Sequence, residues 1–379
     1  MALALTEEQQ LLKQTALDFF KEKAPVKTLR RLRDTKDATG FSRDLWREMA
    51  ALGWAGIVFP EEYGGSDFGY LGLGLVLEAA GRTLAATPLV STVLLCGSAV
   101  MLAGNEAQRR DVLPAVAAGE RIMALAIDEG PRHQPLQIAL KAAKAGDGYK
   151  LSGEKVFVLD GHIADQLIVA ARTAGKPGEA AGITLFLVDA AAKGITRTRT
   201  FMVDSRNAAR IRFDAVAVDA DAVLGAVDRG GAVLEQVLDR GRIGLAAEML
   251  GSASEAFERT LNYLKTRKQF GVLIGSFQAL KHRAAEMFCE IELAKSVVLD
   301  ALSALDERRN DVAQLASLAK ARLADTLFLV SNEGVQMHGG IGMTDEEEIG
   351  FFMKRARVAQ ATFGDAAFHR DRYAGLEGF

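Results

Sequence analysis

The chain has 379 residues, of which 49% are hydrophobic and 25% charged, a globular composition long enough for two or three domains. Its formal net charge of −3 offers no basic surface of the kind that binds nucleic acid. The two cysteines and five histidines show no metal-ligand spacing, which predicts neither a metal site nor a disulfide framework. A cytoplasmic protein is expected, because cysteine is scarce and no signal peptide is recognised.

Residues 1 to about 122 are predicted to be helical. Thr6 begins a Thr-Glu-Glu-Gln capping box, a second helix is expected from Ser42, and a third carries Leu75 and Ala79 on one face. The stretch 83–105 contains no charged residue and is long enough to span a bilayer. Its Pro, Ser, Thr and Gly residues, and the lack of a cationic cluster beside it, favour a buried helix and no membrane association.

From about 123 to 225 the pattern changes to short β-rich runs separated by turn residues, which predicts a β-barrel or sandwich. The runs are MALAI, QIALKAA, KLSGEKVFVL, DQLIVAART, ITLFLVDA and IRFDAVAV. Asp147-Gly148 is predicted to be the turn of a hairpin. From about 226 the chain is helical again, with long amphipathic runs at 232–265, 276–308 and 311–338 that predict an antiparallel bundle.

The connection between the first two of these helices carries the strongest functional pattern. Lys265, Arg267 and Lys268 precede Phe270 and Gly271, and such residues suit a diphosphate beside a flat aromatic ring. The alternative is a basic helix end that complements the helix dipole. Further along, GVQMHGGIGMT (334–344) contains a glycine pair that lets phosphate approach backbone N–H groups, or that simply ends a helix.

Together, RKQFG, IGSFQ and GVQMHGGIGMT resemble the flavin-binding segments of the acyl-CoA dehydrogenase family, and LGWAGIVFPEEYGG resembles its N-terminal domain. The resemblance implies an α+β fold with three domains. These are an N-terminal α-helical domain (1–122), a middle β-barrel or sandwich domain (123–225) and a C-terminal four-helix-bundle domain (226–379). It also implies FAD, an acyl-CoA substrate, an electron-transfer flavoprotein as electron acceptor, and a second subunit against the bundle.

The family's FAD contacts can be carried over to individual positions. The residues implied are Arg267, Phe270, Gln278, Gln336, Gly339, Gly340 and Phe157. All of them except Phe157 are expected at the diphosphate and adenosine half of FAD. Of these six, Gln336, Gly339 and Gly340 reach the cofactor from a neighbouring subunit. Two departures predict altered contact with the flavin ring. IDEGPR (127–132) replaces a Thr-Glu-Pro-Gly loop, and Leu159 replaces the threonine whose hydroxyl binds the flavin.

The family's reaction needs a carboxylate that takes a proton from the α carbon while the flavin accepts a hydride from the β carbon. The two positions at which members carry this glutamate hold Phe363 and Gly241 here. Asp365 and Glu248 are the nearest carboxylates that could substitute. The alternatives are that Asp365 caps a helix or pairs with Arg370 or Lys354, and that Glu248 pairs with Arg242 inside the bundle.

Two functions therefore remain open. The chain is either a FAD-dependent acyl-CoA dehydrogenase, or a non-catalytic subunit that completes the flavin site for a partner chain carrying the glutamate. The first predicts a homo-oligomer and the second a heteromer. The acyl group is not specified by the sequence.

Overall fold

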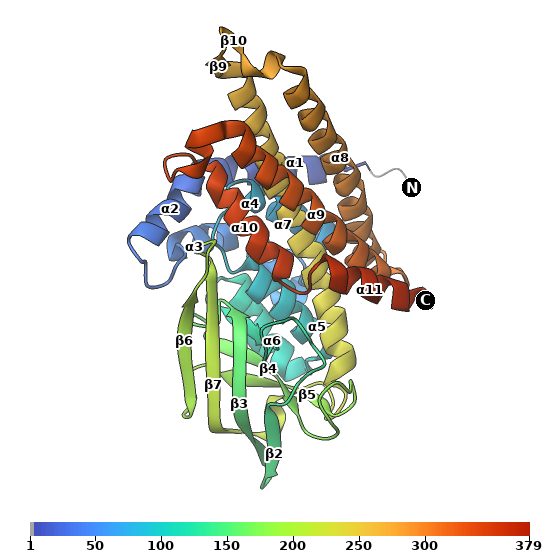
Figure 1. Cartoon of the computed structure of the whole chain (residues 1–379). Coiled ribbons are helices and arrows are strands. Elements are labelled where there is room, and N and C mark those ends of the chain that lie inside the picture. The colour runs from blue at the N-terminus through green and yellow to red at the C-terminus, as the bar shows by residue number, and fades with distance from the viewer. Residues whose placement is uncertain (1–3) are drawn as a thin grey trace. The chain divides into compact units, whose positions relative to one another are not determined.

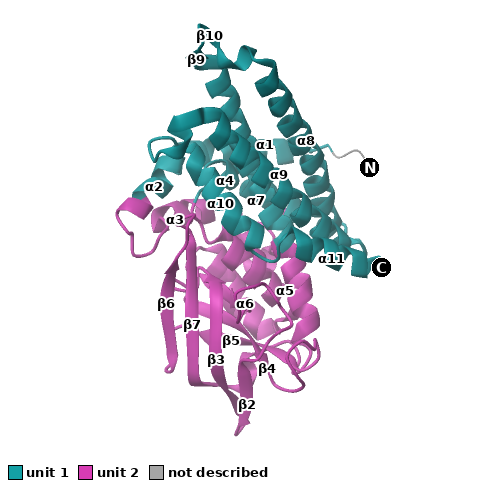
Figure 2. Ribbon diagram, viewed as in Figure 1, with its two compact units in different colours: residues 1–31, 70–85, 242–379 teal, residues 32–69, 86–241 magenta. Residues whose placement is uncertain are grey.

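The computed structural model describes residues 4–379, which divide into two compact units (Figure 2). Unit 1 combines the chain up to residue 31 with residues 70–85 and 242–379, and unit 2 comprises residues 32–69 and 86–241. Unit 1 is built of helices and one short two-stranded hairpin, and unit 2 contains the main sheet together with shorter helices. The predicted α+β class is therefore confirmed, while the domain boundaries at 122 and 225 stay a prediction.

The helices are longest in the C-terminal part of the chain. Those that contribute to unit 1 are α1 (Glu7–Lys23), α2 (Val26–Asp34), α4 (Gly69–Arg82), α7 (Gly230–Thr266), α8 (Gln278–Asp306), α9 (Val312–His338), α10 (Ile349–Ala361) and α11 (Ala366–Leu376). The predicted helices at 232–265, 276–308 and 311–338 correspond to α7, α8 and α9, and α8 and α9 lie side by side in Figure 1. Unit 2 contains α3 (Arg43–Ala51), α5 (Ser98–Ala103), α6 (Glu106–Ala117) and the beginning of α7.

Helix starts follow the caps expected from the sequence. Thr6 Oγ1 accepts the N–H of Gln9 at 3.2 Å, and Gln9 Oε1 accepts the N–H of Thr6 at 3.0 Å. Ser42 caps α3 by accepting the N–H of Leu45 at 3.2 Å. Each cap satisfies a backbone donor that the first helical turn leaves without a partner.

Glycines allow α4 to approach α7 and α8 closely within unit 1. A Cβ at Gly81 would lie 2.0 Å from the carbonyl oxygen of Glu248, and one at Gly251 would lie 1.8 Å from that of Glu78. Ser252 Oγ donates to the carbonyl of Gly81 at 2.9 Å and joins the two backbones directly. Gly74 meets the side chain of Leu302 of α8 in the same way.

The main sheet has eight strands, and seven of them follow the order β6-β7-β3-β2-β4-β5-β8. β1 pairs in parallel with β4, while the other pairs are antiparallel except for one parallel contact between β2 and β4. The strands are β1 (Met123–Ala126), β2 (Lys141–Ala145), β3 (Gly148–Leu159), β4 (Gln166–Arg172), β5 (Ile183–Asp189), β6 (Ile195–Phe201), β7 (Asn207–Val218) and β8 (Val223–Leu224). Their buried apolar residues form one core cluster.

Two local predictions in this region were wrong, and one strand was not predicted. The turn between β2 and β3 is Gly146-Asp147 rather than Asp147-Gly148, because Ala145 pairs with Gly148 and Gly146 adopts a positive φ of 60°. The run QIALKAA becomes strand only from Lys141. β6 was missed because ITRTRTF alternates Thr and Arg without an apolar face, as suits a largely exposed edge strand.

Most of the uncharged stretch 83–105 is buried, as predicted, but it is not one regular helix. It forms a π-helix (Leu89–Gly97) followed directly by α5, and Thr92 Oγ1 bonds the backbone of Met123 in β1 in both directions. Within residues 4–379, no helix combines the length and apolarity needed to cross a membrane.

Candidate functional site

The connection between α7 and α8 is a tight hairpin that exposes its side chains. β9 (Lys268–Gln269) pairs with β10 (Val272–Leu273), and the two central residues, Phe270 and Gly271, have φ of 54° and 78°. Positive φ at both positions is the geometry of a type I′ turn. The Phe270 side chain is 92% exposed, and its ring lies edge-on to Phe277 with 6.1 Å between centroids. An aromatic ring held outward in this way is available to a ligand or a neighbouring subunit.

The cations beside this turn are also available. Lys265, Arg267 and Lys268 are all exposed, and their side chains have no ion-pair partner among residues 4–379. Gln278 is the first residue of α8 and is exposed as well. The turn therefore presents an aromatic face, an amide and three cations to solvent.

The second predicted segment lies at the end of α9. Gln336, Gly339 and Gly340 are exposed, and nothing lies within 4 Å of the positions that a Cβ would take at the two glycines. Gly339 ends the helix with φ of 66°, which explains why glycine occurs there. The backbone is thus open on the side from which a phosphate would approach.

A ring stack joins the two segments. The rings of Tyr263 and His338 lie 4.4 Å apart between centroids with 25° between their planes. Tyr263 is four residues before Arg267, and His338 directly precedes Gly339. The structure therefore brings the two predicted segments to the same end of unit 1.

The positions predicted to lie at the flavin ring belong to unit 2. Phe157 is half-buried at an irregularity of β3, where the register with β7 shifts between Lys155 and Val158, and its φ is 53°. Leu159, two residues on, ends the strand. The loop that begins at Ile127 follows β1, and the carbonyl of Asp128 accepts the N–H of Val156 at 2.8 Å. The backbone of this region is fixed, although the hydroxyl donor of the family is replaced by Leu159.

An ion pair not identified from the sequence fixes this loop. Lys155 is fully buried, and its Nζ donates to Glu129 Oε1 at 2.7 Å and to the carbonyl of Ile127 at 2.8 Å. The Glu129 carboxylate also accepts the N–H groups of Ala139 and Leu140. Burial lowers the pKa of Lys155 to about 8, and the negative charge of Glu129 opposes this shift. The Glu129 carboxylate therefore stabilises the loop in which it lies.

Neither position predicted to correspond to the catalytic glutamate carries a carboxylate. Phe363 lies between α10 and α11, is 7% exposed and has φ of 59°. Gly364 follows with φ of 105°, and a Cβ there would lie 2.3 Å from the Phe368 ring. Gly241 lies inside α7.

The two candidate substitutes have structural partners. Asp365 is exposed and caps α11 by accepting the N–H of Phe368 at 2.9 Å. Glu248 is 4% exposed, and its Oε1 accepts from Arg355 Nε at 3.1 Å and Nη2 at 2.9 Å. Asp365 therefore has the capping role that was considered for it. Glu248 forms an ion pair with Arg355, a partner that was not predicted.

Two buried basic side chains form hydrogen bonds to the turn that contains Phe363. Lys320 of α9 and His369 of α11 are fully buried and bond backbone carbonyls of residues 360–364. Burial lowers the pKa of Lys320 to about 7, with Asp365 opposing this shift and Arg242 adding to it. Burial, together with Lys320 and Arg242, lowers the pKa of His369 to about 2, so the imidazole is neutral. Nothing in the helical pattern distinguishes these residues from surface ones.

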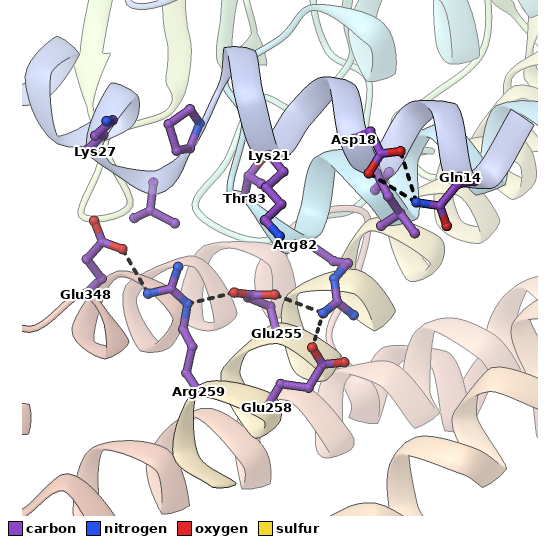
Figure 3. A pocket seen from close by; sticks show the side chains of 14 residues that line it. Gln14, Asp18, Lys21, Lys27, Arg82, Thr83, Glu255, Glu258, Arg259 and Glu348 are labelled. Atoms are coloured by element: carbon purple, nitrogen blue, oxygen red, sulfur yellow. Dashed lines mark hydrogen bonds and ion pairs between the residues drawn. The ribbon is translucent and has the colours of Figure 1, made fainter. Parts of the chain in front are cut away.

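Unit 1 also contains a cavity of about 700 Å³ away from these residues. Four connected ion pairs lie among the residues that line it (Figure 3). Arg259 pairs with Glu348 and Glu255. Arg82 pairs with Glu255 and Glu258. None of the FAD-binding residues implied by the sequence lines it. The paired charges join α4, α7 and α10, and we assign the cavity no ligand. In residues 4–379, no group of three or more His, Cys, Asp or Glu residues could hold a metal ion.

Comparison with known proteins identifies the family. The N-terminal, middle and C-terminal domain models of acyl-CoA dehydrogenase match residues 6–120, 129–216 and 228–375. Mitochondrial isovaleryl-CoA dehydrogenase of Pongo abelii is 31% identical over 376 residues, covering 97% of this chain and 88% of that one. The chain belongs to the acyl-CoA dehydrogenase family, whose members depend on FAD.

Solved structures agree with this assignment. A chain from a study of the electron transferring flavoprotein of Acidaminococcus fermentans superposes with a TM-score of 0.93 at 30% identity, with full coverage of both chains. A chain of the ChsE4-ChsE5 complex from Mycobacterium tuberculosis superposes with a TM-score of 0.90 at 26% identity, again with full coverage of both.

Proposed function

We propose that this chain takes part in the α,β-dehydrogenation of an acyl-CoA thioester, with FAD as cofactor and an electron-transfer flavoprotein as electron acceptor. The observation that carries the proposal is the joining of the two segments predicted to bind FAD, at one exposed end of unit 1, by the Tyr263–His338 stack. The family assignment supplies the reaction. The study of the electron transferring flavoprotein to which one similar structure belongs supports the choice of electron acceptor.

The chain's own residues fit the adenosine half of FAD. In this proposal Arg267 pairs with the diphosphate, Phe270 and Gln278 contact the adenosine end, and Gln336 lies beside them. The open backbone at Gly339 and Gly340 admits phosphate oxygens. When bound, FAD accepts the hydride from the β carbon of the substrate.

Exposure of this cluster supports an oligomer. Its six residues, Arg267, Phe270, Gln278, Gln336, Gly339 and Gly340, are all exposed in the single chain. We propose that they contact a cofactor whose flavin ring is held mainly by a neighbouring subunit. In the ring half, Phe157 of each chain would pack against the flavin, without the hydroxyl bond that Leu159 cannot make.

A second candidate function is favoured by Phe363. In this case the chain is a non-catalytic subunit, and a partner chain of the same family supplies the glutamate. Phe363 cannot accept a proton, Gly241 has no side chain to do so, and Glu248 is engaged with Arg355. The strings KTRKQFG, IGSFQAL, QMHGGIGMT and FGDA also resemble the small subunit of pimeloyl-CoA dehydrogenase. The similar structure from Mycobacterium tuberculosis is described as a complex of two different proteins, ChsE4 and ChsE5.

One experiment tests the proposal and separates its two forms. The chain is purified alone and together with a glutamate-bearing family member from the same source, and flavin per chain is measured by absorbance. Anaerobic reduction of the flavin by an acyl-CoA ester is then followed in a stopped-flow instrument. One flavin per chain and bleaching by the chain alone support the dehydrogenase. Bleaching only in the mixture supports the subunit. No flavin and no acyl-CoA binding in either preparation contradict both.

A cytoplasmic location also stays a proposal. It is based on the scarcity of cysteine, since Cys96 is buried and Cys289 is an exposed free thiol.

A further inference from the structure

The segment between α9 and α10 is acidic and follows the glycine pair closely. A short 3₁₀ helix covers Gly339–Met343, and residues 345–348 are Asp-Glu-Glu-Glu. Carboxylates this close to a backbone that is expected to accept phosphate repel the phosphate unless their charges are paired. The contacts of these four side chains therefore affect how the glycine pair is presented to a ligand.

Arg30 of α2 bonds the first carboxylate of this acidic run. Its Nη1 donates to Asp345 Oδ2 at 2.8 Å and also to the backbone carbonyl of Asp345. The same guanidinium lies over the ring of Phe351 in α10, 4.8 Å from the ring centroid. Arg30 therefore fixes both the side chain and the backbone of Asp345.

Arg259 of α7 repeats this arrangement at the other end of the run. Its Nη1 donates to Glu348 Oε2 at 2.8 Å, and its guanidinium lies 5.5 Å from the centroid of the Phe352 ring (Figure 3). The two arginines come from helices that are far apart in the sequence, and each combines one carboxylate with one of two consecutive phenylalanine rings. The acidic run is thus held at its first and its last residue.

The two carboxylates between these anchors have different contacts. Glu347 Oε1 accepts the N–H of Glu348 at 2.8 Å and stays within the segment. Glu346 is exposed and forms no hydrogen bond or ion pair with residues 4–379. Glu346 therefore offers a matched control for Asp345, because it carries the same charge one residue further on without the contact to an arginine.

Hydrogen bonds connect Asp345 back to the glycine pair. Thr344 directly precedes Asp345, and both its N–H and its hydroxyl donate to the carbonyl of Ile341, at 3.0 and 2.8 Å. Ile341 directly follows Gly340. The position of Asp345, which Arg30 fixes, is therefore passed on to the backbone at Gly340 through one closed turn.

The chain before the glycine pair is held as well. His338 directly precedes the pair, and its ring stacks on that of Tyr263 in α7. Its Nδ1 lies 2.6 Å from the carbonyl oxygen of Gly334, one turn earlier in α9. Gly339 and Gly340 are therefore anchored on both sides, while nothing lies within 4 Å of the positions that a Cβ would take on them.

We propose that Arg30 and Arg259 are positioning residues for the cofactor. By fixing Asp345 and Glu348, they hold the segment after the glycine pair so that its backbone stays open toward the FAD diphosphate, and they pair two carboxylates that would otherwise repel it. The inference rests on the proposed function, because FAD must bind for the position of the pair to matter. It assigns a role in cofactor binding to α2, which contains none of the residues predicted to contact FAD.

Positioning and simple charge repulsion predict opposite results for the acidic run. If the carboxylates act only through their charge, removing any one of them beside the diphosphate tightens FAD binding. If Asp345 anchors the segment, Asp345→Ala weakens FAD binding although it removes a negative charge. Glu346→Ala removes an equal charge that no arginine holds, so the comparison of these two variants separates the two effects.

The holoprotein as purified, with any co-purifying subunit, is diluted in steps, and released FAD is measured by its fluorescence to give a Kd. Asp345→Ala, Arg30→Gln and Arg259→Gln should each raise this Kd about tenfold, the scale of one charge-assisted hydrogen bond. Glu346→Ala should leave the Kd unchanged or lower it. Arg30→Lys should retain most of the affinity, because an ammonium group can still pair with Asp345.

Hydrogen exchange provides a second readout that does not depend on FAD affinity. In protein freed of FAD, the backbone of residues 338–345 should exchange faster in Asp345→Ala and Arg30→Gln than in Glu346→Ala. Equal exchange in the three variants overturns the inference. So does an equal Kd in Asp345→Ala and Glu346→Ala, or tighter binding in both, when wild type binds FAD. A wild type that binds no FAD contradicts the proposed function and the inference together.

Discussion

The carboxylate of Glu248 in α7 is bonded to Arg355 in α10, with Oε1 2.9 Å from Nη2 and 3.1 Å from Nε. Both residues are buried, at 4% and 9% exposure. A buried charge that loses its partner keeps its desolvation cost, typically about 3–5 kcal/mol. We therefore expect Glu248→Gln to lower the free energy of unfolding by that order.

Chemical denaturation followed by circular dichroism measures this loss. The double variant Glu248→Gln, Arg355→Gln should be more stable than either single variant, since it leaves no lone charge. Arg47→Gln, whose side chain is 70% exposed in its pair with Asp44, is the control and should change stability by less than about 1 kcal/mol. Normal stability combined with lost flavin bleaching in Glu248→Gln would instead identify this carboxylate as the base.

The crossing of α4 and α7 predicts a strong effect of small substitutions. Gly81→Ala and Gly251→Ala place a methyl group about 2 Å from a backbone oxygen, so the helices must separate. Overpacking of this kind costs about 1–3 kcal/mol. Gly350→Ala in α10 has open space and should be stabilising by up to about 1 kcal/mol, because alanine is the better helix former. Thermal unfolding of the three variants provides the comparison.

Restoring a carboxylate should raise the rate of flavin reduction. Phe363→Glu places an acceptor on a turn whose backbone is already fixed, and a positioned base contributes roughly 10²–10⁴-fold. Gly241→Glu tests the alternative position on α7. Anaerobic single-turnover bleaching by an acyl-CoA compares both with wild type. Asp365→Asn retains a capping side chain and is expected to bleach like wild type; loss of bleaching in that variant would show that Asp365 is the base.

Lys320 should make stability depend on pH in a defined direction. Its pKa falls from 10.5 in the unfolded chain to about 7 in the fold because of burial. Between these values the unfolded chain binds more protons, so this group's contribution to stability rises with pH. The difference in unfolding free energy between wild type and Lys320→Met should therefore shift in favour of wild type from pH 7 to pH 9. A difference that stays constant with pH would contradict the lowered pKa.

The exposed turn after α7 predicts a selective effect on the cofactor. Arg267→Gln removes a cation from the diphosphate end and should lower flavin per chain without changing the unfolding midpoint of the apoprotein. The matched control is Lys295→Gln on α8, which removes a surface cation far from both FAD-binding segments in the sequence. Flavin absorbance after gel filtration measures occupancy. Equal occupancy in the two variants would remove Arg267 from the proposed site.

Much of the fold was predictable because it depends on local patterns. The capping box at Thr6, the cap at Ser42 and the long amphipathic helices each follow from the residues within a few turns. β6 was not predictable, since an edge strand needs no apolar face and its alternation of Thr and Arg resembles a loop. The π-helix at Leu89–Gly97 contacts β1 through Thr92, and no local pattern in the sequence indicates it.

The candidate site, too, was only partly predictable from the sequence. The positions of Arg267 and Gly339 were indicated by composition and by resemblance, because backbone turns with particular φ values leave a residue pattern. Lys155 and Lys320 were not, although both are fully buried cations. Their acceptors are mostly backbone carbonyls from other parts of the chain, and a carbonyl is present at every residue. The sequence alone therefore cannot show which lysine will be buried.

Unit 1 combines segments that lie far apart in the sequence, so it can be completed only late in synthesis of the chain. The segments ending at residues 31 and 85 join a unit whose remaining part begins only at residue 242. Gly81 and Gly74 of α4 pack against Glu248 of α7 and Leu302 of α8, so α4 lacks these neighbours until α7 and α8 have been made. At about 5–20 residues per second, the remaining chain takes on the order of 15–60 s to make. The newly made N-terminal helices should thus depend on a holding chaperone during that interval, and deletion of α11 should raise the fraction of chain that is retained by it.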